Sequence, residues 1–167
     1  MPEKNLEYNT KIERGYTKVN DYIIDYLKPK IKGRYLDVGC NTGFLLSEMK
    51  NGVGIDASRF CVMECIKKGL NASHAWSDDI PFSDNSFDTV VISCTLEQCD
   101  DWKKSLDECI RVSKDIVIGI NPIPGSPWGI IGKHRTKSVI DPNVLIEKYG
   151  ATCINIDEHR YYFEIKK

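Results

Sequence analysis

Residues 35–46, YLDVGCNTGFLL, decide the fold that this sequence predicts. A short apolar run leads into a loop of small residues bracketed by Gly39 and Gly43, and a second apolar run follows. Loops of this shape turn a strand tightly into a helix and hold the polar end of a small molecule. Asp37 lies inside the first apolar run, where a carboxylate is costly unless it is paired. We therefore expect a strand, a ligand-binding loop and a helix.

Strand-like and helical segments alternate along the rest of the chain. Helical spacing of apolar residues predicts a helix over 12–28, and helical segments also follow the strand-like runs. The continuous apolar runs TVVISC (89–94) and DIVIGI (115–120) are typical of strands that are buried on both faces. This alternation predicts a Rossmann-like α/β fold, in which helices cover both faces of a doubly wound, mostly parallel sheet.

The C-terminal segment departs from the alternation. A short helical segment over 141–150 precedes two strand-like runs, 151–157 and 160–166. A link this short permits only an antiparallel hairpin, which we expect to close the sheet. The chain of 167 residues has the length of one domain, so we expect a single domain over 1–167 with an N-terminal helical cap over 1–31.

Residues 121–140 are expected to form a loop on the substrate side. The part from 121 to 138 contains three prolines and three glycines and follows no periodic pattern. Long loops in compact domains are commonly functional. Its first residues, NPIP (121–124), are interpreted as a strand exit, because proline cannot extend a ladder.

The amino-acid composition limits which binding partners and which cellular compartment we expect for this protein. Lys plus Arg (23) nearly balances Asp plus Glu (24), which argues against nucleic acid or an anionic membrane as partner. No apolar run has the length of a membrane span, and the polar N-terminus is unlike a secretory signal, so we expect a cytoplasmic protein. The seven cysteines form no CxxC pair and the three histidines are scattered, so we expect no metal site.

The residues at the ends of the predicted strands indicate the class of ligand. Asp56 ends the run GVGID, where a carboxylate can accept hydrogen bonds from a ribose diol. An adenosine-containing cofactor is therefore expected. The spacing between Gly39 and Gly43 is not that of a G-x-G-x-x-G loop, and no phosphate-cradling loop is present. Asp37 would repel a pyrophosphate but suits a ligand with a cationic ammonium end.

Four segments resemble, in order, the motifs of the class I S-adenosylmethionine-dependent methyltransferases, and above all their type 11 branch. They are YLDVGCNTGFLL, GVGIDAS, DDIPFSDNSFDTVVISCTLEQCDD and LDECIRVSKDIVIGI. The resemblance runs from about residue 34 to residue 122. It implies S-adenosylmethionine as cofactor and methyl transfer to an acceptor that is a small molecule or is presented by another chain.

The resemblance also implies roles for residues. Asp37 and the two loop glycines match the methionine end of the cofactor site, Asp56 matches the ribose ligand, and Ser77 to Ile80 match the adenine wall. The implied cofactor-binding set is Asp37, Gly39, Cys40, Asn41, Gly43, Asp56, Ala57, Ser77, Asp78, Ile80, Thr95 and Leu96.

Three positions depart from the family pattern. Asn41 replaces the usual middle glycine, which is tolerable because asparagine reaches left-handed backbone angles readily. Trp76 occupies the place where an acid often contacts the adenine amino group. Either Asp78 makes that contact instead, or no residue does. Gln98 stands where many members have histidine.

Plainer interpretations stay open for these residues. Asp37 could cap a backbone turn, and Asp56 could cap the following helix. Asp78 and Asp79 could be solvated loop acids. The basic cluster of the long loop could recognise an acidic substrate or could form a solvated face; it comprises Lys133, His134, Arg135 and Lys137.

No residue stands out from the sequence as the catalytic base. The candidates are His134, Glu97 and Tyr16, although a helix-start role for Glu97 and a core role for Tyr16 explain these two residues equally well.

Two rival functions stay open beside methyl transfer. One is an inactive cofactor-binding subunit that supports a partner protein. The other is a nicotinamide-dependent oxidoreductase of similar topology.

Overall fold

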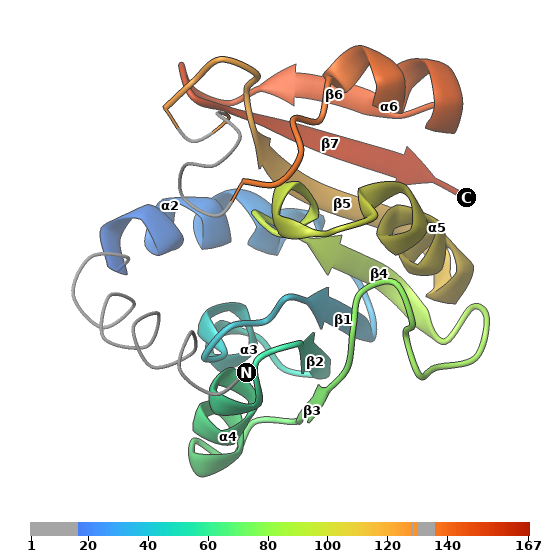
Figure 1. Cartoon of the computed structure of the whole chain (residues 1–167). Helices are drawn as coiled ribbons and strands as arrows, with labels where there is room; N and C mark the ends of the chain where they lie inside the picture. Colours follow the sequence, from blue (N-terminus) through green and yellow to red (C-terminus); the bar gives the residue numbers. More distant parts are fainter. Residues whose placement is uncertain (1–16, 128, 130–135) are drawn as a thin grey trace.

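The computed structural model describes residues 17–127, 129 and 136–167, in which a seven-stranded sheet has helices on both faces (Figure 1). Within these residues the strand order is β3-β2-β1-β4-β5-β7-β6. The elements are α2 (Thr17–Leu27), η1 (Lys28–Lys30), β1 (Tyr35–Val38), α3 (Phe44–Glu48), β2 (Gly52–Asp56), α4 (Arg59–Lys67), β3 (Ala72–His74), β4 (Phe87–Ile92), η2 (Leu96–Gln98), α5 (Trp102–Val112), β5 (Ser113–Pro122), α6 (Pro142–Tyr149), β6 (Thr152–Asn155) and β7 (Arg160–Lys166).

The first five strands run parallel, as the sequence predicts. β1 pairs with β2 on one side and with β4 on the other, so that Leu36 lies opposite both Val53 and Val90. The chain extends the sheet in one direction through β2 and β3, and then returns past β1 to add β4 and β5. The carboxyl ends of β1 and β4 therefore form the switch point of the sheet, where α/β proteins bind ligands.

Two hydrophobic cores lie on opposite faces of the sheet. Along β1 the residues alternate between them, since Leu36 and Val38 belong to one core and Tyr35 to the other. Leu106 of α5 and Leu145 of α6 pack into the first core, and α2, α3 and α4 contribute to the second. The prediction of helices on both faces is confirmed.

The C-terminal hairpin is confirmed, and it also lengthens a neighbouring strand. β7 pairs antiparallel with both β5 and β6, so it lies between them. Its pairing with β5 continues to Asn121, opposite Tyr161, and to Pro122, opposite Arg160. The prediction that a loop begins at residue 121 was therefore wrong by two residues. Hydrogen bonding to β7, which the local sequence does not reveal, extends β5 through Pro122.

Several predictions fall on residues that the structure does not describe. The first part of the helix expected over 12–28 lies outside the described residues, as do the two catalytic candidates Tyr16 and His134 and two of the basic loop residues, Lys133 and Arg135. No helix in the described ranges combines the length and the apolar character needed to cross a bilayer.

Candidate functional site

The loop between β1 and α3 is held against the end of β2. The backbone N–H groups of Gly39 and Cys40 both donate to the carbonyl of Ile55, at 2.8 and 3.0 Å. Gly39 and Gly43 have φ angles of 77° and 84°, and Asn41 has a φ angle of 50°. The left-handed conformation predicted for Asn41 is thereby confirmed.

Asp56 joins this loop to the start of α4. One of its carboxylate oxygens accepts the backbone N–H of Asn41 at 2.9 Å, and the other accepts that of Ser58 at 2.8 Å. The N-cap of α4 is Ser58, whose hydroxyl accepts the N–H of Cys61. The interpretation of Asp56 as the helix cap was therefore wrong. Its two backbone hydrogen bonds fix the carboxylate at the carboxyl end of β2.

Asp37 is a buried acid at the same edge of the sheet. Its exposed fraction is 6%. Burial, with a further contribution from the charge of Asp56, raises the pKa of Asp37 to about 7. Among the hydrogen bonds of the described residues, none reaches the Asp37 carboxylate. A cationic group placed here would favour the ionised form of Asp37 and lower the cost of its burial.

The end of β4 closes the site on the other side of the loop. A Cβ atom added to Gly39 would collide with the hydroxyl and methyl groups of Thr95. Only glycine allows this close approach at a positive φ angle. The loop glycine, Asp56 and Thr95 therefore meet at the switch point.

The predicted adenine wall lies after β3, with its side chains turned largely into the protein. The Ser77 hydroxyl is hydrogen bonded to Ser105 at 2.9 Å, and Ile80 and Leu96 are buried in a hydrophobic core. Asp78 lies 3.7 Å from the ammonium group of Lys104. By contrast, 58% of Trp76 is exposed. Contacts of Ile80 and Leu96 with a cofactor would therefore come largely from backbone atoms.

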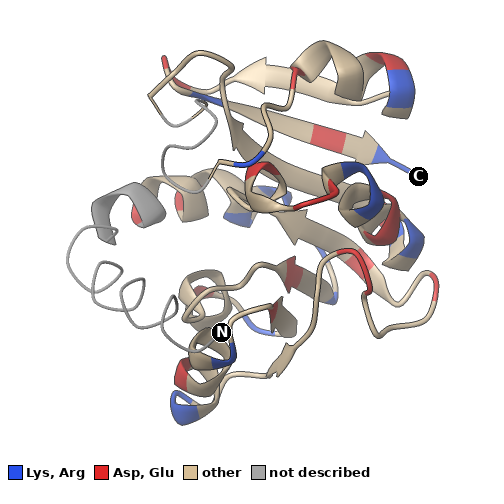
Figure 2. Cartoon of the chain, viewed as in Figure 1, with Lys and Arg blue, Asp and Glu red and all other residues tan. Residues whose placement is uncertain are grey.

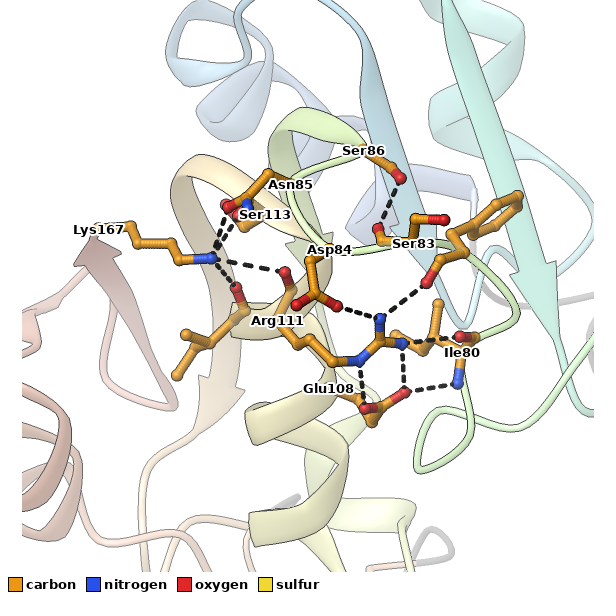
Figure 3. Close-up of polar contacts among 11 residues, drawn as sticks. Ile80, Ser83, Asp84, Asn85, Ser86, Glu108, Arg111, Ser113 and Lys167 are labelled. Atoms are coloured by element: carbon orange, nitrogen blue, oxygen red, sulfur yellow. Dashed lines mark hydrogen bonds and ion pairs between the residues drawn. The ribbon is translucent and has the colours of Figure 1, made fainter.

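A polar network that the sequence did not reveal holds the backbone of this wall (Figure 3). Glu108 accepts the backbone N–H of Ile80 at 2.9 Å, and the Arg111 guanidinium donates to the Ile80 carbonyl at 2.9 Å. Arg111 also binds Glu108, the Phe82 carbonyl and Asp84. The spacing of Glu108 and Arg111 on one helix face indicates a pair, but only the fold reveals the loop that it clamps.

Replacing Arg111 by Met should destabilise the protein by about 1–3 kcal/mol, because the partly buried carbonyl groups of Ile80 and Phe82 lose a charged donor. Urea denaturation measures this loss. Lys114→Met is the matched control, since Lys114 forms a 3.5 Å ion pair with Asp88 at the surface. Such exposed pairs contribute about 0–1 kcal/mol. Equal losses in the two variants would show that Arg111 does not clamp the loop.

Of the catalytic candidates, Glu97 lies within the described residues. It is in η2, directly after β4, and 6% of it is exposed. Burial raises the pKa of Glu97 to about 7, although its own backbone N–H and the Gln98 side chain counteract the shift. The Gln98 amide itself donates to the Cys94 carbonyl at 2.6 Å.

Most of the predicted cofactor-binding residues thus lie on the side of the sheet where the parallel strands have their carboxyl ends. Acidic residues rather than basic ones lie on β1 and β2 there (Figure 2). This charge suits an ammonium group and a ribose diol better than a phosphate. The described residues contain no group of three or more His, Cys, Asp or Glu side chains placed to hold a metal ion.

Solved structures with similar folds include methyltransferases that use S-adenosylmethionine. One, from Thermotoga maritima, is described as a possible histamine N-methyltransferase; it is 16% identical, with a TM-score of 0.76 over 96% of this chain and 97% of that one. Another is the magnesium protoporphyrin IX methyltransferase of Synechocystis with bound S-adenosylhomocysteine, 12% identical with a TM-score of 0.67 over 90% of this chain and 82% of that one. These matches establish the fold.

Sequence comparison places the chain in a family. It is 36% identical over 101 residues to an uncharacterized protein of Methanocaldococcus jannaschii, a match that covers 58% of this chain and 49% of that protein. The chain spans about half the length of the curated relatives it matches. Residues 19–128, more than half of the chain, match the model of the family described as methionine biosynthesis protein MetW. The chain therefore belongs to the MetW family.

Proposed function

We propose that this chain binds S-adenosylmethionine and transfers its methyl group to a small molecule or to an acceptor presented by a partner. The observation that carries the proposal is the pair of acids at the switch point. The Asp37 carboxylate is buried without a hydrogen bond among the described residues, and Asp56 is fixed by two backbone N–H groups beside it. The ammonium of the cofactor would lie near Asp37, and its ribose near Asp56. The motif order supports the type 11 branch.

The proposed reaction places few chemical demands on the protein. The sulfonium already activates the methyl group, so the chain has to orient the donor and the acceptor and to exclude water. The loop from Gly39 to Gly43 would hold the amino-acid end of the cofactor. The clamped turn at Ile80 would border its adenine, and Thr95 would lie near its sulfur.

A second candidate function is an inactive S-adenosylmethionine-binding subunit that supports a partner protein. The exposed Trp76 favours this second function, because an acid often contacts the adenine amino group at that place in the fold.

Incubation with S-adenosylmethionine labelled in the methyl group separates the two functions. The chain is supplied with metabolite pools, alone and with partner proteins that copurify with it. A labelled product, suppressed by excess S-adenosylhomocysteine, is expected; cofactor binding without any product would favour the inactive subunit.

The Asp56→Ala variant should bind S-adenosylhomocysteine more weakly by about 1.5–3 kcal/mol, the range for hydrogen bonds to a charged group. Calorimetric titration measures the change, and circular dichroism checks that the variant is folded. Glu64→Ala removes an acid from the neighbouring helix α4, where Glu64 pairs with Lys67, and should leave affinity unchanged. A dissociation constant equal to that of the wild type in Asp56→Ala would remove Asp56 from the site.

A further inference from the structure

Two buried side-chain oxygens beside the proposed cofactor site have no hydrogen-bond partner within the part of the chain that the structure describes. They are Oε2 of Glu97 and Oδ1 of Asn121. The exposed fractions of these residues are 6% and 0%. An unsatisfied buried polar atom costs about 1–3 kcal/mol, and folded proteins satisfy nearly all of them. Two such atoms in one region therefore suggest that a ligand supplies the missing hydrogen bonds.

The two oxygens lie in one neighbourhood at the carboxyl ends of β4 and β5. The backbone N–H of Cys94 donates to the carbonyl of Ile120 at 2.7 Å, which joins the two strand ends. Tyr161 lies opposite Asn121 in the sheet and is hydrogen bonded to it. Burial and, among nearby charges, that of the Glu97 carboxylate raise the pKa of that same tyrosine. Tyr161 thus contacts Asn121 and lies within electrostatic range of Glu97.

Hydrogen bonding fixes which atom of the Asn121 amide lacks a partner. The Tyr161 hydroxyl donates its hydrogen to the Ile140 carbonyl at 2.8 Å, so toward Asn121 it can only accept. It accepts from Nδ2 of Asn121 at 3.1 Å. The remaining amide atom, Oδ1, is therefore a hydrogen-bond acceptor that calls for a donor.

Glu97 is positioned firmly and can exchange a proton near neutral pH. Its backbone carbonyl accepts the N–H groups of Lys137 and Ser138, at 2.7 and 3.1 Å. Burial raises the pKa of its carboxyl to about 7, which is the range in which a general base is effective. Glu97 follows Thr95 by two residues, so its backbone borders the place proposed for the sulfonium.

We infer that Glu97 and Asn121 bind the nitrogen of the methyl acceptor, and that the acceptor is a small primary amine. Two acceptor oxygens require at least two polar hydrogens, which an amino group supplies. A hydroxyl group supplies one and a carboxylate supplies none. The inference rests on the proposed function, because it assigns the second substrate of the same site.

A proton transfer to Glu97 precedes the transfer of the methyl group. The Glu97 carboxylate takes a proton from the bound ammonium group, which leaves a neutral amine with a free lone pair. That lone pair forms the new nitrogen–carbon bond as the sulfur–methyl bond breaks. The electron pair of the broken bond stays on sulfur and gives S-adenosylhomocysteine. The product is a methylated ammonium ion. Asn121 holds the nitrogen in line during the transfer.

A binding test uses n-butylamine, n-butanol and butyrate, three probes of similar size. Isotope-labelled protein saturated with S-adenosylhomocysteine is titrated with each, and chemical-shift changes are followed by NMR. The amine is expected to bind, with shifts around Cys94 and Tyr161, and the other two probes are expected to bind at least tenfold more weakly. Equal binding of the three probes, or no binding of the amine, would overturn the inference.

Variants test the two residues directly. Glu97→Gln and Asn121→Ala should weaken amine binding about 10- to 100-fold, as loss of a hydrogen bond to a charged group does. Where labelled methyl transfer to an amine is measurable, Glu97→Gln should lower turnover about 10²- to 10⁴-fold. Ser113→Ala is the matched control, because the buried hydroxyl of Ser113 also lacks a partner among the described residues but lies at the opposite end of β5. It should change neither quantity.

The stability of the free protein separates a binding role from a structural one. Replacing a buried carboxyl group whose pKa is raised by burial should leave Glu97→Gln at least as stable as wild type at pH 8. A destabilised Glu97→Gln that binds the amine normally would overturn the inference.

Calorimetry with S-adenosylhomocysteine alone shows whether the proposed function fails or only the further inference fails. If that nucleoside does not bind, the proposed function fails; if it binds and the amine does not, only the further inference fails.

Discussion

At pH 8, the Asp37→Asn variant is expected to have a higher free energy of unfolding than wild type, by at most roughly 4 kcal/mol. The folded-state pKa of Asp37 is about 7 and its ordinary value is 3.8. Between these pH values the folded protein holds a proton that the unfolded chain has lost. The contribution of Asp37 to stability therefore falls as the pH rises from about 4 to 7, and stays low above 7.

The same variant should bind S-adenosylhomocysteine more weakly, because the ammonium group of the ligand loses its carboxylate. Urea denaturation from pH 4 to pH 8 and calorimetric titration at pH 8 measure the two effects. A gain in stability together with a loss of affinity is characteristic of a binding residue kept at a cost to the fold.

Asp88→Asn is the control with the opposite sign. The Arg34 backbone N–H, followed by Lys114, lowers the pKa of Asp88. That acid therefore stabilises the fold above its unfolded-state pKa and loses this effect as the pH falls. Asp88→Asn should be less stable than wild type at pH 8 and should retain cofactor affinity. If Asp37→Asn behaved like Asp88→Asn, Asp37 would have a structural role only.

Gly119→Ala in β5 should destabilise the protein by about 1–3 kcal/mol, toward the upper end of the range for overpacking. An added Cβ would collide with the backbone carbonyl of Ile92 in β4, and would lie 2.6 Å from a ring carbon of Phe163 in β7. A backbone carbonyl in a strand pair cannot rotate away, so the strands must separate. Chemical denaturation measures the loss.

Gly69→Ala provides the comparison for this variant. Gly69 has a φ angle of 73°, and no atom of residues 17–127, 129 or 136–167 lies within 4 Å of an added Cβ, so the substitution costs backbone strain. That cost is about 1 kcal/mol. Gly119→Ala should be the more damaging of the two. A smaller loss at Gly119 than at Gly69 would show that β4 and β5 tolerate separation, and that their carboxyl ends, near Glu97 and Asn121, are not held rigidly.

The sequence was informative where local chemistry determines structure. Apolar runs bounded by glycine, such as that around Asp37, predicted the parallel strands, and the short link before Arg160 predicted the hairpin. The left-handed conformation of Asn41 followed from the backbone preference of asparagine. These features depend on neighbours within a few residues along the chain.

Features that depend on distant neighbours could not be predicted. β5 continues through Asn121 because β7 pairs with it, and the clamp on Ile80 comes from a helix 28 residues further along the chain. Burial of the Ile80 and Leu96 side chains likewise depends on tertiary packing. The predicted cofactor-binding residues stay predictions, although the structure brings the loop, Asp56 and Thr95 together.

The most direct test of the central claim is a calorimetric titration of the wild-type chain with S-adenosylhomocysteine and, separately, with NAD. The site has a buried acid where a pyrophosphate would lie and lacks the glycine spacing that admits one. We expect one-to-one binding of S-adenosylhomocysteine, weakened in Asp37→Asn and Asp56→Ala, and no measurable binding of NAD. Tight binding of NAD with no response to S-adenosylhomocysteine would show that the site does not bind S-adenosylmethionine.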